Sequence, residues 1–363
     1  MRKIKSNFKC RLCNSSNIAK INLSLPRAIS PFLSREKTWK NFYCPRCNSI
    51  SHFLKKKKNL IKYSDSSYRK SSNFQADRPS SPISLPWSTI TSLRSSHISK
   101  LIEKFNISDK FNCKNINLLD YGGYNGFTSY GLKSFFNIED ITVADLDPNG
   151  LKIASSLGMK AVNLHKSVLS KNIKNKFDLC ISVHVFEHLK KPEVALGEIH
   201  KCLKDNGILY VEVPNLFGSF LTDPAHLLSF SKEGLKNLIS NNGFKIIKIG
   251  FIRTPKEAIK YGYPYSNWRE CIYCIAKKET YLNLMRKKSK KGKILKPKEI
   301  IYSKKKFLAK LAVSNFFFTL TYPYNLLNFI LNLLKRFIIE IIRSFLSLSS
   351  SLFFLFINLF KND

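Results

Sequence analysis

The chain has 363 residues, which is enough for one full α/β domain with smaller additions. Its formal net charge of +37 indicates nucleic acid or an anionic membrane as a partner, although the abundance of Lys, Asn, Ile and Phe is also what AT-rich codons produce. Nine cysteines, four of them in two tight pairs, favour a reducing compartment and metal binding over a disulfide framework, and the basic amino terminus predicts no secretory signal peptide.

The first motif is a double C-x-x-C pattern, with thirty residues between the two pairs. Cys10 and Cys13 form the first pair, and Cys44 and Cys47 form the second. Two such knuckles supply four thiolates in a tetrahedron, which suits a structural Zn²⁺ because the closed shell leaves no position for a substrate. We therefore expect residues 1–54 to be a zinc-binding module; unrelated cysteines or a redox pair are the alternatives.

Residues 55–85 are a Lys run followed by Ser-rich and Pro-containing sequence, which predicts a linker. Helical spacing of apolar residues returns over 90–105, and His97 lies within this predicted helix.

A glycine-rich turn organises the central part of the chain. A predicted strand over 116–121 contains Asp120 near its end and runs into a loop with Gly122, Gly123 and Gly126. A strand, a glycine turn and a helix open a doubly wound sheet, whose ligands lie at the carboxyl ends of the strands. Glycine lets the backbone approach a bound nucleoside closely.

A second acidic residue follows at the expected distance. After a helix predicted over 127–136, the strand over 141–145 ends in Asp145, about twenty residues beyond the glycines. A carboxylate here accepts hydrogen bonds from both ribose hydroxyls, and its charge disfavours NADP.

Together with later motifs, these residues resemble the class I S-adenosylmethionine-dependent methyltransferases over roughly 112–278. The motifs that carry the resemblance lie at 118–126, 143–145, 177–189 and 203–215. The sequence departs from the family at Tyr124, where a glycine is usual. The resemblance implies that Asp120 and the loop from Gly122 through Gly123 to Gly126 hold the methionine end of S-adenosyl-L-methionine, and that Asp145 and Leu146 hold its ribose.

The expected fold is α/β, a doubly wound seven-stranded Rossmann-like sheet. The predicted organisation is a zinc module at 1–54, a linker at 55–85, a methyltransferase domain with an N-terminal lid helix at 86–278, a basic linker at 279–306 and an apolar helical tail at 307–363. The later predicted elements are a helix over 192–204, a turn at 205–207, a strand over 208–213, a helix over 232–240, a strand over 245–251 and a last strand from Cys271.

Two histidines are candidates for catalysis. His184 follows the strand predicted over 177–182, whose end faces the transferred methyl group in the resembled family, and Glu187 and His188 come next. His226 precedes the helix over 232–240, and a neutral imidazole there can accept the proton of an alcohol as the methyl group arrives. A role in packing is the alternative for each histidine.

The tail is apolar after a Lys-rich stretch. Over 325–347 its polar residues fall on one helical face, which favours a peripheral position on an anionic membrane; helix packing, oligomerisation and a true span are the alternatives. We expect a cytoplasmic protein, peripheral at the inner face of the cell membrane.

The predicted function is methyl transfer to a small metabolite or a sugar-containing acceptor, such as a lipid-linked surface glycan. The amino-terminal cysteine module resembles that of bacterial sugar and small-metabolite methyltransferases. The alternatives are an RNA methyltransferase, a quinone or lipid methyltransferase, and a non-catalytic binding protein. The Asn/Asp-Pro-Pro-aromatic tetrad of nucleic-acid amino-methyltransferases is absent, so nucleic acid is the less favoured partner.

Overall fold

The computed structural model describes residues 9–21, 39–54, 87–105, 115–165, 168–217, 226–252, 271–279, 303–306 and 308–309. The predicted linker at 55–85, nearly all of the basic linker at 279–306 and the amphipathic helix at 325–347 lie outside these ranges.

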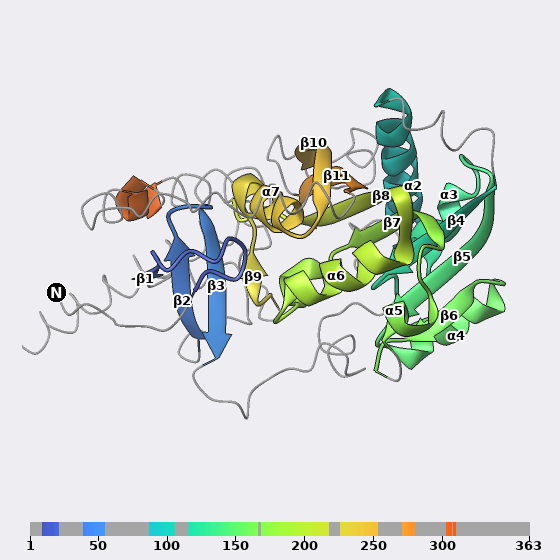
Figure 1. Ribbon diagram of the computed structural model, residues 1–363, viewed down its shortest axis with the longest axis horizontal. Coiled ribbons are helices and arrows are strands. Elements are labelled where there is room, and N and C mark those ends of the chain that lie inside the picture. The colour runs from blue at the N-terminus through green and yellow to red at the C-terminus, as the bar shows by residue number, and fades with distance from the viewer. Residues whose placement is uncertain are drawn as a thin grey trace, which may run out of the picture.

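A seven-stranded sheet forms the centre of the molecule, in the order β10-β11-β8-β7-β4-β5-β6 (Figure 1). The strands are β4 Ile116–Tyr121, β5 Ile138–Asp145, β6 Lys160–Asn163, β7 Phe177–Val183, β8 Leu203–Pro214, β10 Phe244–Ile252 and β11 Cys271–Lys278. Within this sheet β11 is antiparallel to both neighbours, and the other pairings are parallel. The predicted α/β class and the seven-stranded doubly wound sheet are confirmed.

Helices cover both faces of the sheet, which explains why its central strands are almost continuously apolar. The helices are α2 Trp87–Lys104, α3 Phe127–Leu132, α4 Pro148–Ser156, α5 Leu169–Asn172, the 3₁₀ turn η5 Phe186–His188, α6 Pro192–Cys202 and α7 Lys232–Asn241. One buried cluster packs α2, α3 and α4 against one face, and another packs α5, α6 and α7 against the opposite face.

Several boundaries differ from the sequence prediction: β5 begins at Ile138 rather than at 141, and two helix ends also differ. Helix α3 ends at Leu132 rather than at 136, and the chain continues through turns. Helix α6 ends at Cys202 and β8 begins at once, so the turn predicted at 205–207 is a bend inside the strand. Asn206 lies at this bend with a φ of 65°, a conformation that Asn tolerates better than most residues.

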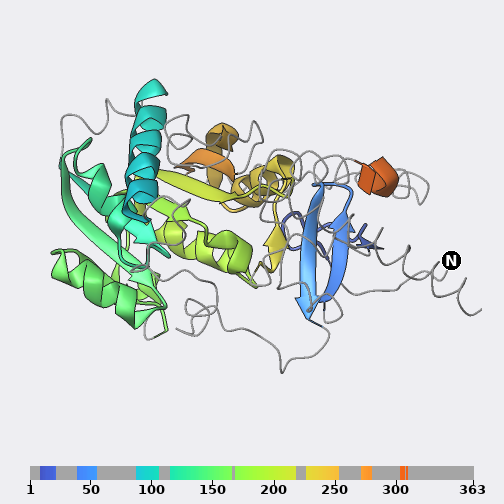
Figure 2. The ribbon, with the colours of Figure 1, turned by 180° about the vertical axis from the view of Figure 1, so that it is seen from behind.

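A second sheet, of four strands, joins the amino-terminal residues to the central domain. Its order is β1 Ala19–Ile21, β2 Trp39–Cys44, β3 Ser49–Leu54 and β9 Leu228–Ser229. Strand β9 belongs to the segment between β8 and α7, so the amino-terminal hairpin pairs with the central domain (Figure 2). The sequence did not predict β9, because two residues are too few to show a strand pattern.

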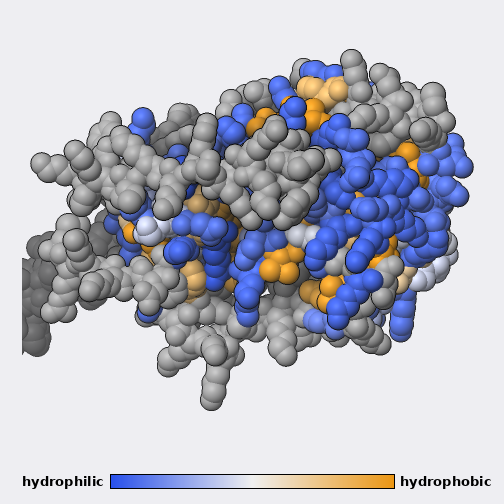
Figure 3. Space-filling view, viewed as in Figure 1, coloured by the Kyte–Doolittle hydropathy of each residue, from blue (hydrophilic) through white to orange (hydrophobic). Residues whose placement is uncertain are grey.

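The described surface carries few large apolar side chains, and the exposed ones come from separate elements. They are Tyr130, Phe135, Ile153, Val168, Val194 and Ile247. Figure 3 shows hydrophilic residues over most of the described part of one face, with small apolar groups between them. In the described part of the chain, no helix combines the length and the apolar character needed to cross a membrane.

Candidate functional site

The glycine loop lies directly over a buried carboxylate. A Cβ added to Gly123 would stand 2.2 Å from Cγ of Asp120, so only glycine lets the loop pass this close. Asp120 is 3% exposed, and its Oδ2 meets no hydrogen-bond partner among the described residues. Burial raises the pKa of Asp120 to about 7, and the charge of Asp145 adds to this effect. A buried carboxylate oxygen without a partner is suited to a cationic group.

Tyr124, where a glycine is usual in the resembled family, adopts a left-handed backbone conformation. Its φ is 53°, in the same left-handed region as Gly122 at 77° and Gly126 at 71°. The ring of Tyr124 covers Gly150 in α4, where an added Cβ would stand 2.2 Å from the Tyr124 ring. Gly150 thus provides the space that the tyrosine ring needs.

Asp145 supports the same loop from the neighbouring strand. Its Oδ2 accepts a hydrogen bond from the backbone N–H of Tyr124 at 2.8 Å, and its Oδ1 accepts one from Asp147 at 2.8 Å. Each carboxylate oxygen has a further lone pair, so Asp145 can still accept ribose hydroxyls. Leu146 is partly exposed beside it. The predicted cofactor residues therefore gather at one edge of the sheet, and Asp120 lies within the electrostatic influence of Asp145.

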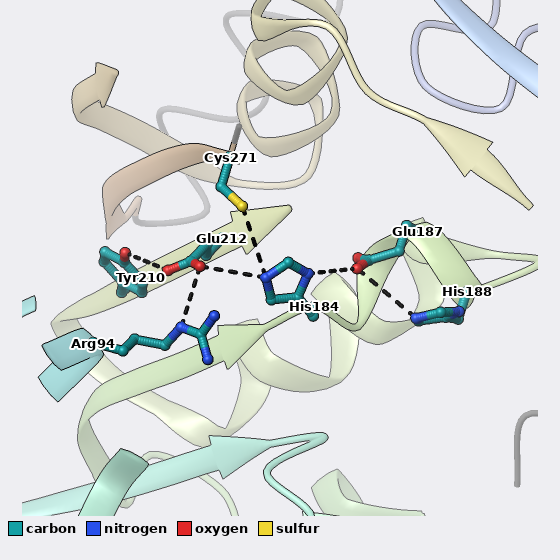
Figure 4. A network of polar contacts seen from close by, with 7 residues as sticks. All are labelled: Arg94, His184, Glu187, His188, Tyr210, Glu212 and Cys271. Carbon is teal, nitrogen blue, oxygen red and sulfur yellow. Dashed lines mark hydrogen bonds and ion pairs between the residues drawn. The ribbon is translucent and has the colours of Figure 1, made fainter. Parts of the chain in front are cut away.

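A polar network lies at the ends of β7 and β8, with His184 at its centre (Figure 4). His184 Nδ1 is 3.2 Å from Oε1 of Glu187, and its Nε2 is 3.4 Å from Oε1 of Glu212 and 3.8 Å from Sγ of Cys271. Arg94 donates from Nε to the same Glu212 oxygen at 3.2 Å. His184 itself has a φ of 55°, which turns the chain sharply after β7.

The network holds His184 and Glu212 in their charged forms. Burial alone lowers the pKa of His184, but contacts with Cys271, Glu187 and Glu212 outweigh burial and raise this pKa well above its usual range. Burial likewise opposes ionisation of Glu212, but Arg94 and His184 lower its pKa to about 2. Both ring nitrogens of His184 face carboxylates, so the charged imidazole links Glu187 to Glu212.

The structure brings the second predicted histidine to the same end of the sheet. The ring of His226 lies 4.9 Å from the ring of His188, centroid to centroid, at an interplanar angle of 68°. The backbone N–H of Leu227 donates to the carbonyl of Glu187 at 2.7 Å and fixes this approach. His184 and His226 both act electrostatically on Glu187, which lies between them in the network.

The amino-terminal hairpin contributes to the position of His226. The backbone N–H of His52 donates to the carbonyl of Leu227 at 2.9 Å, and His52 Nε2 lies 2.7 Å from Oγ of Ser229. Sequence reasoning missed the contributions of Arg94, Glu212 and His52. A single acid in the apolar strand over 208–214 was the signal for Glu212.

The four amino-terminal cysteines converge on one point. Cys10 and Cys47 have their sulfurs 3.6 Å apart, those of Cys13 and Cys44 are 3.5 Å apart, and all four lie within 4.8 Å of one another. Sulfurs on one tetrahedral Zn²⁺ lie about 3.8 Å apart, from Zn–S bonds of about 2.3 Å. The group is therefore compatible with zinc.

Each knuckle closes in the same way. Asn14 and Asn48 follow the second cysteine of each pair, with φ values of 56° and 51°. Asn is among the non-glycine residues that adopt this conformation most readily, so both knuckle turns form without a glycine.

The central domain is similar to known methyltransferase structures and to one protein family. Residues 92–249 match a family described as "Methyltransferase domain". No curated protein matches the chain significantly in sequence. Similar solved structures include a SAM-dependent methyltransferase from Archaeoglobus fulgidus, at 18% identity and a TM-score of 0.39 over 51% of this chain and 94% of that one. The YcgJ protein from Bacillus subtilis, at 16% identity and a TM-score of 0.39, covers 52% of this chain and 98% of its own.

The family match covers the glycine loop, Asp145, α7 and the His184 network apart from Cys271. Residues 92–249 are thus similar to a methyltransferase domain, and the order of the seven-stranded sheet agrees with the α/β fold expected from the sequence.

Proposed function

We propose that the protein transfers a methyl group from S-adenosyl-L-methionine to a small metabolite or a sugar-containing acceptor. The observation that carries the proposal is the buried Asp120 carboxylate, whose Oδ2 has no hydrogen-bond partner in the described residues and lies beneath Gly123. The cofactor carries an ammonium group at its methionine end, which matches this oxygen in charge and hydrogen bonding.

Asp120 and the Gly122–Gly126 loop would hold the methionine end, and Asp145 with Leu146 would hold the ribose. The cofactor supplies an already activated methyl group, so the protein mainly positions the acceptor and excludes water. The fixed loop geometry, in which Asp145 anchors the backbone of Tyr124, supports this positioning role.

On the acceptor side, the candidate residues are His184 and His226. His184, whose side chain is 28% exposed, would act by orienting Glu187 and Glu212 at the acceptor end of the sheet. His226 lies on the segment that β9 holds against the amino-terminal hairpin, close to Glu187. A Zn²⁺ on the four cysteines would be structural, because a four-sulfur shell is complete. A lipid-linked acceptor, met at the membrane through the tail, belongs to the same proposal.

Calorimetry with S-adenosyl-L-methionine and with its demethylated product, S-adenosylhomocysteine, tests the proposal. We expect both to bind the wild-type protein, and Asp145→Ala to weaken binding at least tenfold because it removes the proposed ribose contact and the support of Tyr124. Asp140→Asn is the matched control, since Asp140 lies on the same strand and pairs with Lys160 at the surface. The absence of measurable affinity for either compound would contradict the proposal and favour a non-catalytic binding protein.

A further inference from the structure

A second group of side chains that are possible metal ligands lies beside the proposed active site. Glu187, His188 and His226 each offer one ligand atom, and these atoms lie within 4.8 Å of one another. All three side chains are almost fully buried, at 1%, 6% and 7% exposure. The group is separate from the four cysteines and comes from η5 and the segment before β9.

The Glu187 carboxylate has one oxygen engaged and one available. His184 Nδ1 lies 3.2 Å from Oε1, whereas Oε2 is buried and meets no hydrogen-bond partner in the described part of the chain. A cluster that served only as an ion pair would be expected to satisfy both oxygens, because buried polar atoms nearly always have partners. His188 Nε2 stands 3.8 Å from Oε1, too far for a hydrogen bond. The contacts within the cluster therefore leave a strong acceptor unused.

The backbone holds the three residues in place. Glu187 and His188 are adjacent in the 3₁₀ turn η5, and the hydrogen bond from Leu227 N–H to the Glu187 carbonyl brings in His226. Ligands on one first-row ion, at about 2.1 Å each, lie roughly 3.0–3.5 Å apart. The ligand atoms of the three residues, all within 4.8 Å of one another, are close to this spacing. His184, bound to Oε1, would orient the carboxylate as an outer-shell partner does in metal sites.

We propose that Glu187, His188 and His226 bind a divalent first-row transition-metal ion. Two imidazoles and one carboxylate leave coordination positions open, as in catalytic zinc and non-haem iron sites, in contrast to the closed four-cysteine group. Under the proposed function, on which this step rests, the open positions would take oxygen atoms of the acceptor. The ion would lower the pKa of a bound hydroxyl, whose proton would pass to solvent water before the oxygen takes the methyl group. His226 is then a ligand, and its nitrogen lone pair is not available as the proton acceptor predicted from the sequence.

Manganese binding by the full-length protein tests the site. Mn²⁺ prefers nitrogen and oxygen ligands, so it is a suitable probe that leaves a zinc-loaded cysteine site unchanged. We expect titration followed by the electron paramagnetic resonance of free Mn²⁺ to show one bound ion per chain. Glu187→Gln and His226→Asn should each weaken binding at least tenfold. Glu139→Gln and His165→Asn, at exposed positions outside the cluster, should bind as the wild type does.

Circular dichroism of each variant shows whether it is folded. Because the His226 side chain is more exposed than that of Glu187, we expect His226→Asn to disturb the fold less than Glu187→Gln. No bound Mn²⁺ in the wild type, or unchanged binding by both folded variants, would overturn the metal site. Binding of S-adenosylhomocysteine without manganese tests the proposed function separately. Binding of this compound without binding of Mn²⁺ would support the methyltransferase proposal and contradict the metal site. Binding of Mn²⁺ without binding of this compound would support the metal site and contradict the methyltransferase proposal.

Discussion

Cofactor binding should release a proton between pH 5.5 and 7. The pKa of Asp120 is about 7 in the cofactor-free protein, against an ordinary 3.8, mainly because the carboxyl is buried. An ammonium group beside Asp120 favours its ionised form and lowers this pKa. At pH 6 about nine-tenths of Asp120 is protonated before binding, so binding should release up to about 0.9 proton. Affinity should then fall by up to about tenfold per pH unit below 7.

Calorimetry of S-adenosylhomocysteine binding in buffers with different ionisation enthalpies measures this proton directly. An α-amino group has a pKa of about 7.7–8.0, so the ligand changes its own charge little below pH 7. Asp120→Asn should abolish the release that Asp120 causes, whereas Asp140→Asn should retain it. Equal heats in all buffers, with an affinity that does not change from pH 7 to 5.5, would refute the assignment of Asp120 to the ammonium site.

Three further changes test other parts of the structure. Arg94→Met should destabilise the fold by roughly 1.5–3 kcal/mol in urea unfolding, because it removes a charge-assisted hydrogen bond to the buried Glu212 carboxylate, which keeps His184 beside it. An effect below about 1 kcal/mol would contradict the ion pair. The pKa of Glu212 falls from 4.5 to about 2 on folding, so the stabilisation that this carboxylate provides is present above pH 4.5 and should be lost as the pH falls from 4.5 to 2. Glu212→Gln should reduce this pH dependence in acid unfolding curves. Ser231→Ala should lower the free energy of unfolding by about 1–2 kcal/mol in thermal unfolding, because Ser231 caps α7 at the Gly234 N–H and also donates to the Cys47 carbonyl. Ser240→Ala, near the end of the same helix, should have little effect.

The sequence predicted those parts of the fold that depend on local patterns. Apolar runs ending in Asp120 and Asp145 marked the strands, and the glycines between them marked the turn. The cysteine spacing predicted a convergence that the structure shows, with all four sulfurs at one point. These features could be predicted from the sequence because each depends on residues close together in the chain or on a spacing that has one simple geometric solution.

Contacts between segments far apart in the chain could not be predicted from the sequence. Arg94 and Glu212 are 118 residues apart, and nothing local in α2 indicates that one of its cations is buried against β8. The pairing of β3 with β9 joins residues about 180 positions apart through a strand of two residues. Such contacts depend on how the helices and sheets pack, and a periodicity within one element carries no information about its partner.

The β3–β9 pairing gives the cysteine group an influence on the proposed acceptor site. Cys47 accepts hydrogen bonds at its carbonyl from Ser49 and Ser231, and Ser231 begins α7 immediately after the segment that carries His226. His52 on β3 contacts both Leu227 and Ser229. An ion on the four sulfurs would therefore hold more than the hairpin, because the hairpin supports the backbone that places His226 beside Glu187. The cysteine group and the central domain therefore form one structural unit. If an ion is bound there, its removal should affect His226 before it affects Asp120 or Asp145, which are held by β4 and β5 on the far side of β7.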